Sequence, residues 1–438
     1  MTWRWLLCVP MVLAVVCELR ADDWPQWLGP QRDSVWRETG VVDVFPTAGL
    51  PIKWRVPVGL GYAGPAVVGD HVYLLDYVKS TGEIANNPSA RIELTGEERI
   101  SCFDIHTGKQ LWVHAYPCNY KLSYPSGPRC TPTVSDGRVY ALGAEGRLTC
   151  LDAKTGELVW AKELTVEYET ETPIWGFAAH PLVHGDLLYC VVGGKGSVAV
   201  AFKKDTGAEV WRALSADSAG YCPPSIIQHG GREQLLIWHP FALNALEPKS
   251  GKVIWSEPLQ PGYEMSVTAP TKSGDRLFAS GIQTVGAMYQ LDAAGKADVL
   301  WRGKSKTALY SCNSPPFFHQ GTVYGADCQV GSFVAFNAAD GKRLWETFQP
   351  TSNGTRRASH GTSYVVQHGD RFFLFSETGD LILARLSPEK YEEISRFHVL
   401  DPTNECFGRK VVWSHPAYAS RCCFARNDKE LVCVDLKK

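Results

Sequence analysis

Hydrophobic and polar residues alternate along most of the chain in short runs that are separated by turn residues. Small residues and proline at 64–68 are followed, after a Gly-Asp turn, by an apolar run at 71–75, and residues 131–134 and 138–142 repeat this arrangement. Alternation with a period of two is typical of β-strands that are buried on one side. The pattern therefore predicts an all-β protein that contains many short strands.

One longer segment of this pattern recurs, and it consists of an apolar strand, a turn with glycine and a second strand that ends in Trp. Its copies are FDIHTGKQLW ending at Trp112, LDAKTGELVW at Trp160, FKKDTGAEVW at Trp211, LEPKSGKVIW at Trp255, LDAAGKADVLW at Trp301 and FNAADGKRLW at Trp345. The spacing of about 44–51 residues is close to the length of one β-propeller blade, a four-stranded antiparallel sheet. The repeat predicts that such blades surround a common axis.

Each copy carries the residues that its turn requires. Asp104 and Asp152 can accept backbone N–H groups where the chain turns, and Gly108 and Gly156 supply a positive φ. A large ring at the same place in every sheet fills the space between neighbouring sheets, so we expect the tryptophans to be buried and not to bind a ligand. This blade-docking role is expected for Trp54, Trp112, Trp160, Trp211, Trp255, Trp301 and Trp345.

The number of blades follows from the number of innermost strands. Eight such strands are predicted, near Gly64, Thr131, His180, Pro224, Ala269, Pro316, Thr362 and His415. The seventh outer strand has Phe397 in place of Trp. The last unit ends at 431–436, before its fourth strand, and residues 52–56 near the N-terminus supply a strand that matches the missing one. The sequence predicts an eight-bladed β-propeller whose last blade is closed by the N-terminal strand, which leaves no free sheet edge at the joint.

Residues 1–21 have the pattern of a secretory signal peptide. Arg4 precedes an apolar segment at 5–17 that is too short to cross a membrane, and Ala21 is a suitable last residue before cleavage. Lipidation at Cys17 is disfavoured because the residue before it is larger than lipoprotein processing prefers. The sequence therefore predicts export to the periplasm or the extracellular space.

The mature chain is expected to contain one large domain with two irregular additions. Residues 22–51 form a lead-in segment that we expect to pack across the ring, and 52–438 form the propeller. A polar insertion at 77–98 interrupts the first blade between its second and third strands, where it either contributes to binding or is simply tolerated length.

Composition narrows the class of partners. The chain has 44 Lys and Arg residues and 46 Asp and Glu residues, which gives a formal net charge of −2. Proteins that bind nucleic acid usually carry an excess of basic residues, so nucleic acid is not expected as a partner. No run after the signal approaches the length of a membrane span, and we expect a monomer. A chain this long forms its core without a disulfide framework, so Cys102, Cys150 and Cys433, at equivalent repeat positions, are interpreted as small buried hydrophobic residues.

The recurring D-x-x-T/S-G-x-x-x-W pattern over 52–438 resembles the PQQ-like β-propeller family, named after enzymes of pyrroloquinoline quinone (PQQ). The resemblance implies two alternative functions. One group of the family comprises dehydrogenases of alcohols and sugars with PQQ and calcium on the axis, and the other resembles the outer-membrane assembly scaffold BamB, which has no cofactor and acts by protein contact. The lead-in sequence WPQWLGPQRDS is similar to exported proteins of the second group. A shared fold does not decide between these functions.

Residues just before the innermost strands are expected to line the central funnel. They are Tyr62, Arg129, Trp175, His180, Tyr221, Cys222, Asn313, His360, Trp413 and His415. The set is rich in aromatic residues but has no cluster of Asp or Glu, whereas calcium requires several hard oxygen ligands and a dehydrogenase requires a carboxylate base. The histidines leave two interpretations open, as ligands of a transition metal or as hydrogen-bond donors to carbonyl groups at the channel mouth.

In dehydrogenases of the resembling family, a vicinal disulfide forms one wall of the cofactor site. Cys422 and Cys423 are the only adjacent cysteines, but they fall in the predicted second strand of the last blade, away from the axis. We therefore expect a scaffold that binds a protein, peptide or glycan, with no catalytic residue, no cofactor and no bound metal. A PQQ- or metal-dependent oxidoreductase with its site in the funnel and a lectin-like carbohydrate-binding module are the alternatives.

Overall fold

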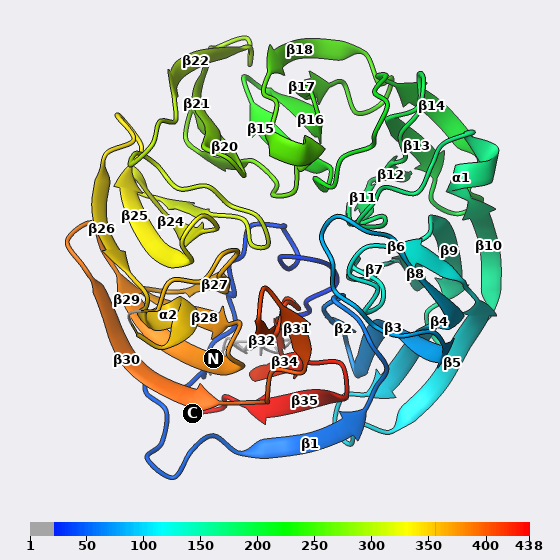
Figure 1. Cartoon of the computed structure of the whole chain (residues 1–438), viewed down its shortest axis with the longest axis horizontal. Helices are drawn as coiled ribbons and strands as arrows, with labels where there is room; N and C mark the ends of the chain where they lie inside the picture. The colour runs from blue at the N-terminus through cyan, green and yellow to red at the C-terminus, as the bar shows by residue number, and fades with distance from the viewer. Residues whose placement is uncertain (1–21, 355) are drawn as a thin grey trace, which may run out of the picture.

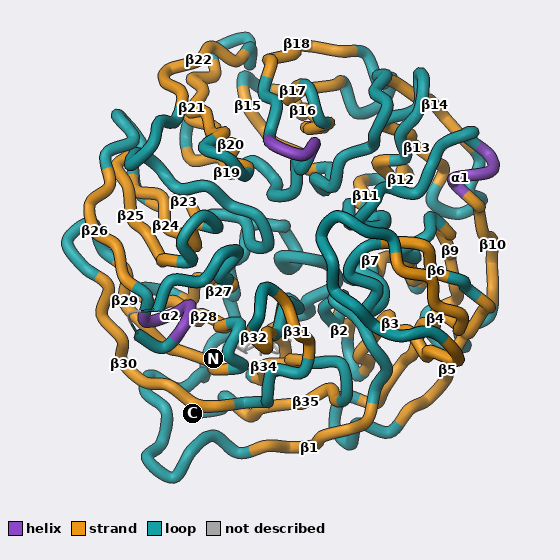
Figure 2. The backbone as a smooth tube through the Cα atoms, viewed as in Figure 1, coloured by secondary structure: helices purple, strands orange, loops and turns teal. Residues whose placement is uncertain are grey.

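The repeats form eight antiparallel sheets that stand like blades around a central axis (Figure 1). The computed structural model describes residues 22–354 and 356–438; the predicted signal peptide lies outside these residues. The prediction of eight four-stranded blades is confirmed. Within these residues, helices are limited to a few short turns, as Figure 2 shows.

In the first seven blades, the strands run outward from the axis in chain order. The first four blades are β2 (Ala66–Val68), β3 (His71–Thr81), β4 (Ile92–Asp104) and β5 (Gln110–Pro117); β7 (Thr133–Ser135), β8 (Arg138–Leu142), β9 (Arg147–Asp152) and β10 (Leu158–Glu163); β11 (Leu182–His184), β12 (Leu187–Val191), β13 (Ala199–Lys203) and β14 (Glu209–Ala213); and β15 (Ser225–His229), β16 (Arg232–His239), β17 (Ala242–Leu246) and β18 (Val253–Pro258).

The next three blades are β19 (Thr271–Ser273), β20 (Arg276–Gly281), β21 (Val285–Leu291) and β22 (Ala297–Arg302); β23 (Phe317–His319), β24 (Thr322–Asp327), β25 (Ser332–Asn337) and β26 (Arg343–Thr347); and β27 (Ser363–His368), β28 (Arg371–Ser376), β29 (Asp380–Leu386) and β30 (Tyr391–His398). The eighth blade consists of β33 (Ala417–Ala419), β34 (Cys422–Arg426), β35 (Glu430–Asp435) and β1 (Ile52–Pro57). Outside the blades are β6 (Tyr120–Leu122), which pairs with β4, the hairpin of β31 (Asn404–Cys406) and β32 (Arg409–Val411), and the helical turns α1 (Leu164–Glu167), η1 (Gly262–Glu264) and α2 (Gln349–Ser352).

The predicted closure of the ring is confirmed, because β1 is the outermost strand of the eighth blade (Figure 1). It pairs antiparallel with β35, so that Trp54 lies opposite Cys433 and Val56 lies opposite Leu431. The first and last parts of the propeller sequence therefore share one sheet, and unfolding of either part exposes the edge of the other.

Neighbouring blades contact each other through the repeated Trp. In the third blade, the Trp211 indole Nε1 donates to the Pro248 carbonyl in the turn of the fourth blade at 2.9 Å. The same contact to the next blade recurs at Trp54, Trp112, Trp160, Trp301 and Trp345. Trp255 differs, because its Nε1 donates to Gln234 Oε1 at 2.9 Å within its own blade.

The turn glycine allows this contact in several of the repeats. Gly156 has φ +75°, and a Cβ on it would lie 2.6 Å from Cε3 of Trp112, the ring of the preceding blade. Gly251 has φ +71°, and its Cβ would lie 2.5 Å from Cε3 of Trp211. The glycine thus permits both the left-handed turn and the close approach of the neighbouring ring, which explains why glycine and Trp recur together.

A bulge precedes each Trp in the outer strand. In the second blade, Leu158 lies opposite Leu151 and Trp160 lies opposite Cys150, so Val159 is the extra residue. Leu158 and Val159 are consequently both exposed, although a regular strand would bury one of them.

The lead-in segment crosses the ring behind the blades in the view of Figure 1, where it is dark blue. Trp24 forms a bridge with Val67 in the first blade, Val35 with Gln367 in the seventh and Val41 with Lys437 beside the eighth. These three blades are neighbours in the closed ring. Arg32 extends the contacts across the axis, because its guanidinium donates to the carbonyl groups of Pro181 and Pro224, just before the third and fourth blades.

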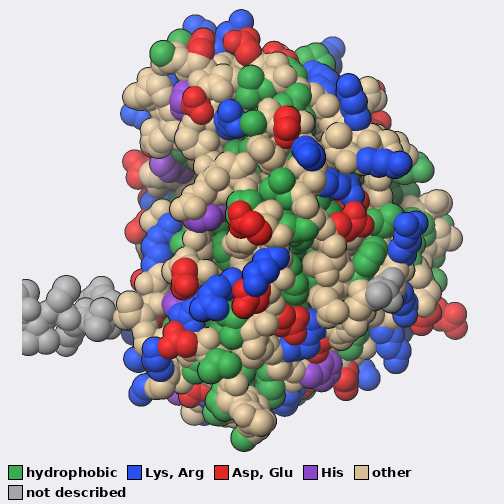
Figure 3. Space-filling model, turned by 90° about the vertical axis from the view of Figure 1, so that its left-hand side faces the viewer, with side chains coloured by type: hydrophobic (Ala, Val, Ile, Leu, Met, Phe, Trp, Pro, Cys, Tyr) green, Lys and Arg blue, Asp and Glu red, His purple; other side chains and the backbone are tan. Residues whose placement is uncertain are grey.

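The cysteines are hydrophobic core residues and form no disulfide among the residues that the structure covers. All twelve from Cys102 to Cys433 are free, and all except Cys118 are buried. The side of the ring in Figure 3 shows acidic and basic side chains interspersed. No helix between 22 and 438, residue 355 aside, is long and apolar enough to cross a membrane.

Candidate functional site: an aromatic pocket on the axis

A pocket with a volume of about 210 Å³ lies on the axis of the ring. The residues predicted for the funnel all contribute to its lining except Cys222, which is buried beside it: Tyr62, Arg129, Trp175, His180, Tyr221, Asn313, His360, Trp413 and His415. The loops before the innermost strands bring these residues together, because each blade points its first strand at the axis.

The floor of the pocket is formed by the lead-in segment. The Trp27 ring stacks on His180 with 4.8 Å between ring centroids, and its edge meets His415 at 5.7 Å. Beneath it, the Arg32 guanidinium donates to the Pro181 carbonyl at 2.6 Å and to the Pro224 carbonyl at 2.7 Å. The lead-in thereby blocks the channel and makes the pocket blind.

Aromatic side chains form most of the wall. Trp175 and Tyr221 contact each other edge to face at 5.6 Å. Tyr124 lies 6.3 Å from Trp413, and the ring of Phe407 lies 6.3 Å from both of them. The wall therefore presents ring faces and edges to any molecule that enters.

Two segments outside the repeat form the rim. Phe407 is at the tip of the β31–β32 hairpin, and Pro88 comes from the insertion in the first blade. Asn86 Nδ2 of the insertion donates to the Glu405 carbonyl of the hairpin at 2.7 Å. The insertion therefore folds inward over the pocket.

Glu377 positions two aromatic residues of the wall. This buried carboxylate accepts hydrogen bonds from Arg409 Nε at 2.7 Å and from Trp413 Nε1 at 3.1 Å, and it also accepts the backbone N–H of Thr362 at 3.0 Å. Arg409 begins β32, next to Phe407. The Glu377–Arg409 ion pair thus fixes the hairpin and the Trp413 indole relative to the seventh blade.

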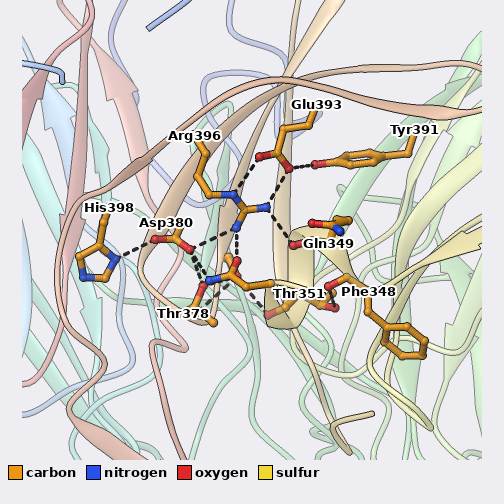
Figure 4. A network of polar contacts seen from close by, with 11 residues as sticks. Phe348, Gln349, Thr351, Thr378, Asp380, Tyr391, Glu393, Arg396 and His398 are labelled. Carbon is orange, nitrogen blue, oxygen red and sulfur yellow. Dashed lines mark hydrogen bonds and ion pairs between the residues drawn. The ribbon is translucent and has the colours of Figure 1, made fainter. Parts of the chain in front are cut away.

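His360 is positioned by the loop between the sixth and seventh blades. A polar network anchors the start of this loop, as Figure 4 shows. Arg396 Nε donates to Glu393 Oε1 at 2.9 Å, while its Nη2 donates to the Gln349 carbonyl at 3.0 Å and its Nη1 contacts Asp380 Oδ2 at 3.2 Å. At the other end of the loop, the His360 ring stacks on Phe407 at 4.8 Å.

The three histidines of the pocket are held neutral by burial. Burial lowers the pKa of His415 to about 3 and, together with the charge of Arg409, lowers the pKa of His360 to about 4. Burial, His415 and Arg32 also lower the pKa of His180 well below its ordinary value. His180 Nδ1 accepts the backbone N–H of Thr131 at 2.9 Å, so the expectation that it donates to a carbonyl group is wrong.

The residues present do not fit calcium-bound PQQ. The pocket lining contains no Asp or Glu among the residues that the structure covers, so calcium would lack carboxylate ligands and the reaction would lack a carboxylate base. Between residues 22 and 438, residue 355 aside, no group of three or more His, Cys, Asp or Glu side chains is arranged to hold a metal ion. Cys422 and Cys423 lie in β34 and do not line the pocket.

Sequence reasoning missed the parts of the pocket that lie outside the repeat. The floor residue Trp27 and the rim residues Phe407 and Pro88 are in irregular segments without periodic pattern. Tyr364 was missed because it is inside an inner strand, whose side chains alternate between faces. The aromatic WPQW sequence of the lead-in was the one available signal for Trp27.

Comparisons with known proteins identify the repeat. A family model described as outer membrane protein assembly factor BamB matches residues 96–263 and 241–438. BamB from Moraxella catarrhalis is similar in structure over 88% of this chain and 99% of its own, with 16% identity and a TM-score of 0.57.

Two dehydrogenases have equally similar structures. A europium-containing methanol dehydrogenase aligns over 94% of this chain and 89% of its own, with 13% identity and a TM-score of 0.59. The quinohemoprotein alcohol dehydrogenase of Comamonas testosteroni aligns over 94% and 80%, with 13% identity and a TM-score of 0.57. No curated protein sequence matches this chain significantly. Identities this low establish a shared fold and leave the function to the site.

Proposed function

Because this chain belongs to the PQQ-like β-propeller family described as outer membrane protein assembly factor BamB, we propose that it is an exported scaffold that acts by binding and not by catalysis. Its site is the axial pocket, which accepts one small molecule or a protruding group of a protein, peptide or glycan partner. The observation that carries the proposal is a blind pocket with an aromatic wall and no carboxylate in its lining among the described residues.

The chemistry of the pocket supports binding. Pockets that hold small molecules are concave, largely apolar and supplied with a few placed polar groups, and this pocket has that composition. Histidines whose pKa values lie at about 3 and about 4 are neutral at neutral pH and weak as proton acceptors. The rim formed by the insertion and the β31–β32 hairpin offers a surface on which a larger partner can rest.

Export to the cell envelope is part of the proposal. It is supported by the signal-like pattern of residues 1–21 and by the description of the family as an outer membrane assembly factor. The interspersed surface charges and the net charge of −2 argue against nucleic acid as the partner.

Native mass spectrometry of the full-length protein from its own host tests the proposal. We expect a bound small molecule, or a co-purifying partner, on the wild-type protein. Ala178 lines the pocket, so Ala178→Trp should fill the space and abolish binding, whereas Ala294→Trp in an exposed turn of the fifth blade should retain it. Equal occupancy in both variants would show that the pocket is not the site.

Incubation with PQQ and calcium separates binding from quinoprotein catalysis. We expect no change of the absorbance spectrum of the quinone and no rise in Tm at saturating cofactor, because calcium finds no carboxylate ligands in the pocket. A stable complex that oxidises alcohols or sugars would overturn the proposed function.

A further inference from the structure

The floor and wall of the pocket carry hydrogen-bond donors that have no acceptor within residues 22–354 and 356–438. Trp27 is 4% exposed, and its indole Nε1 is buried without a partner. His180 uses Nδ1 as the acceptor for Thr131, so the neutral ring carries its proton on Nε2, which lacks an acceptor in the same part of the chain. Tyr364 is 3% exposed and lines the pocket, and its hydroxyl group likewise makes no hydrogen bond there.

The only charged side chain in the described lining is that of Arg129. Its guanidinium lies over the Tyr62 ring at 5.3 Å and donates to the Tyr124 and Ser123 carbonyls at 2.6 and 2.9 Å and to the Gly127 carbonyl. No carboxylate of the described residues forms an ion pair with it. The positive charge of Arg129 is therefore oriented by neutral carbonyl groups and is not neutralised at close range.

These two observations define the charge of the ligand. A buried donor without a partner, such as Trp27 Nε1, is costly, and a ligand rich in acceptors would satisfy it together with the unpaired His180 Nε2 and Tyr364 hydroxyl group. A positive charge without a paired carboxylate favours an anion. An aromatic pocket can also bind a quaternary ammonium group, but Arg129 would repel one.

The size of the pocket restricts the ligand further. Its volume of about 210 Å³ is below the ~300–1,000 Å³ that is typical of pockets for drug-sized ligands. The pocket therefore favours a ligand built on a single ring. The ring would lie against the faces of Trp175, Tyr221 and Trp413.

We propose that the axial pocket binds a monocyclic carboxylate, with the carboxylate held by Arg129 and the unpaired donors and the ring held by the aromatic wall. The inference rests on the proposed function and names its ligand class. A sugar acid and an aromatic acid share this chemistry, and the probes distinguish them.

Isothermal titration of the full-length protein with matched acids and amides tests the inference. The probes are D-glucuronate and benzoate, compared with D-glucuronamide and benzamide, which retain shape but have no charge. At least one acid should bind about 10-fold or more tightly than its amide, since a hydrogen bond to a charged group contributes about 1.5–3 kcal/mol. The acid that shows this preference identifies the ligand as a sugar acid or an aromatic acid.

Two substitutions assign the effect to the pocket. Arg129→Gln should remove the preference for acid over amide, while Arg129→Lys, which keeps the charge, should retain a preference. Tyr364→Phe removes only the hydroxyl group and should weaken acid binding several-fold without lowering Tm. Tyr168→Phe, whose hydroxyl group donates to Glu209 on the outer surface at 2.8 Å, is the matched control and should bind like wild type.

The failure of the inference is distinguishable from the failure of the proposed function. Equal binding of acid and amide in both pairs would overturn the inference and leave a binding pocket in place. The absence of binding by all four probes would also overturn it, and native mass spectrometry would then decide separately whether the pocket holds another ligand. If Arg129→Gln does not fold, the acid–amide comparison on the wild-type protein and the Tyr364→Phe variant still decide between binding and its absence.

Discussion

Removal of a single blade-docking ring should destabilise the whole propeller. Trp211 is 8% exposed and lies between the third and fourth blades. Its ring lies against Gly251, and its Nε1 donates to the Pro248 carbonyl at 2.9 Å. Trp211→Ala removes the ring contact and the hydrogen bond together.

The magnitude follows from the buried area. A buried Trp removes roughly 150–250 Å² from water. At about 25 cal/mol per Å², this corresponds to ~4–6 kcal/mol, close to the ~3–5 kcal/mol observed for truncation of large buried aromatic residues. We therefore expect Trp211→Ala to lower the free energy of unfolding by about 4 kcal/mol. Trp211→Phe keeps most of the ring and loses the hydrogen bond, so about 1–2 kcal/mol is expected.

Urea unfolding, followed by tryptophan fluorescence and far-UV circular dichroism, measures this effect. Coincidence of the two signals shows whether the ring unfolds in one step. Val210→Ala is the matched control, because Val210 precedes Trp211 in β14 and is 42% exposed, and it should change stability by less than about 0.5 kcal/mol. If Trp211→Ala unfolded at the same urea concentration as Val210→Ala, the docking role of the ring would be refuted.

Two further predictions concern the closure of the ring and the buried histidines. Deletion of 22–56 removes both β1, which pairs with β35, and Trp27, which lines the pocket. It should therefore lower Tm far more than deletion of 22–50, which keeps β1. If the protein without 22–56 melted at the same temperature as the full chain, closure of the ring by β1 would be contradicted. The pKa values of His415 and His360 in the folded protein are about 3 and about 4, below the ~6.5 of a histidine in the unfolded chain. Between pH ~6.5 and pH ~3, the unfolded state therefore binds more protons than the folded state. Stability should therefore decrease with acidification in this window, by up to ~1.4 kcal/mol per pH unit for each histidine, and His415→Phe should make the decrease shallower in pH-dependent urea unfolding. An unchanged slope in His415→Phe would contradict the assignment.

The repeat predicted the blades because its information is local and periodic. Asp152 shows this, since its Oδ1 accepts the backbone N–H groups of Lys154 and Thr155 at 3.0 and 3.1 Å in the turn that leads to Trp160. The positions before each innermost strand were predicted as pocket lining for the same reason, because the propeller geometry directs them to the axis. The aromatic and carboxylate-poor character of the site was therefore visible in the sequence.

The protein's sequence by itself determined the number of blades, the strand that closes the ring and the types of residues around the axis, since each depends on a pattern that recurs or on a strand that is missing from it. Only the tertiary structure decided that the pocket has a floor, a rim and unpaired donors. The floor depends on Arg32 reaching the Pro181 carbonyl, 149 residues away, and the rim depends on Asn86 reaching Glu405, 319 residues away. Such contacts join segments that occur only once in the chain, so no repeated sequence pattern predicts them. They form because buried polar groups must find partners in the folded ring.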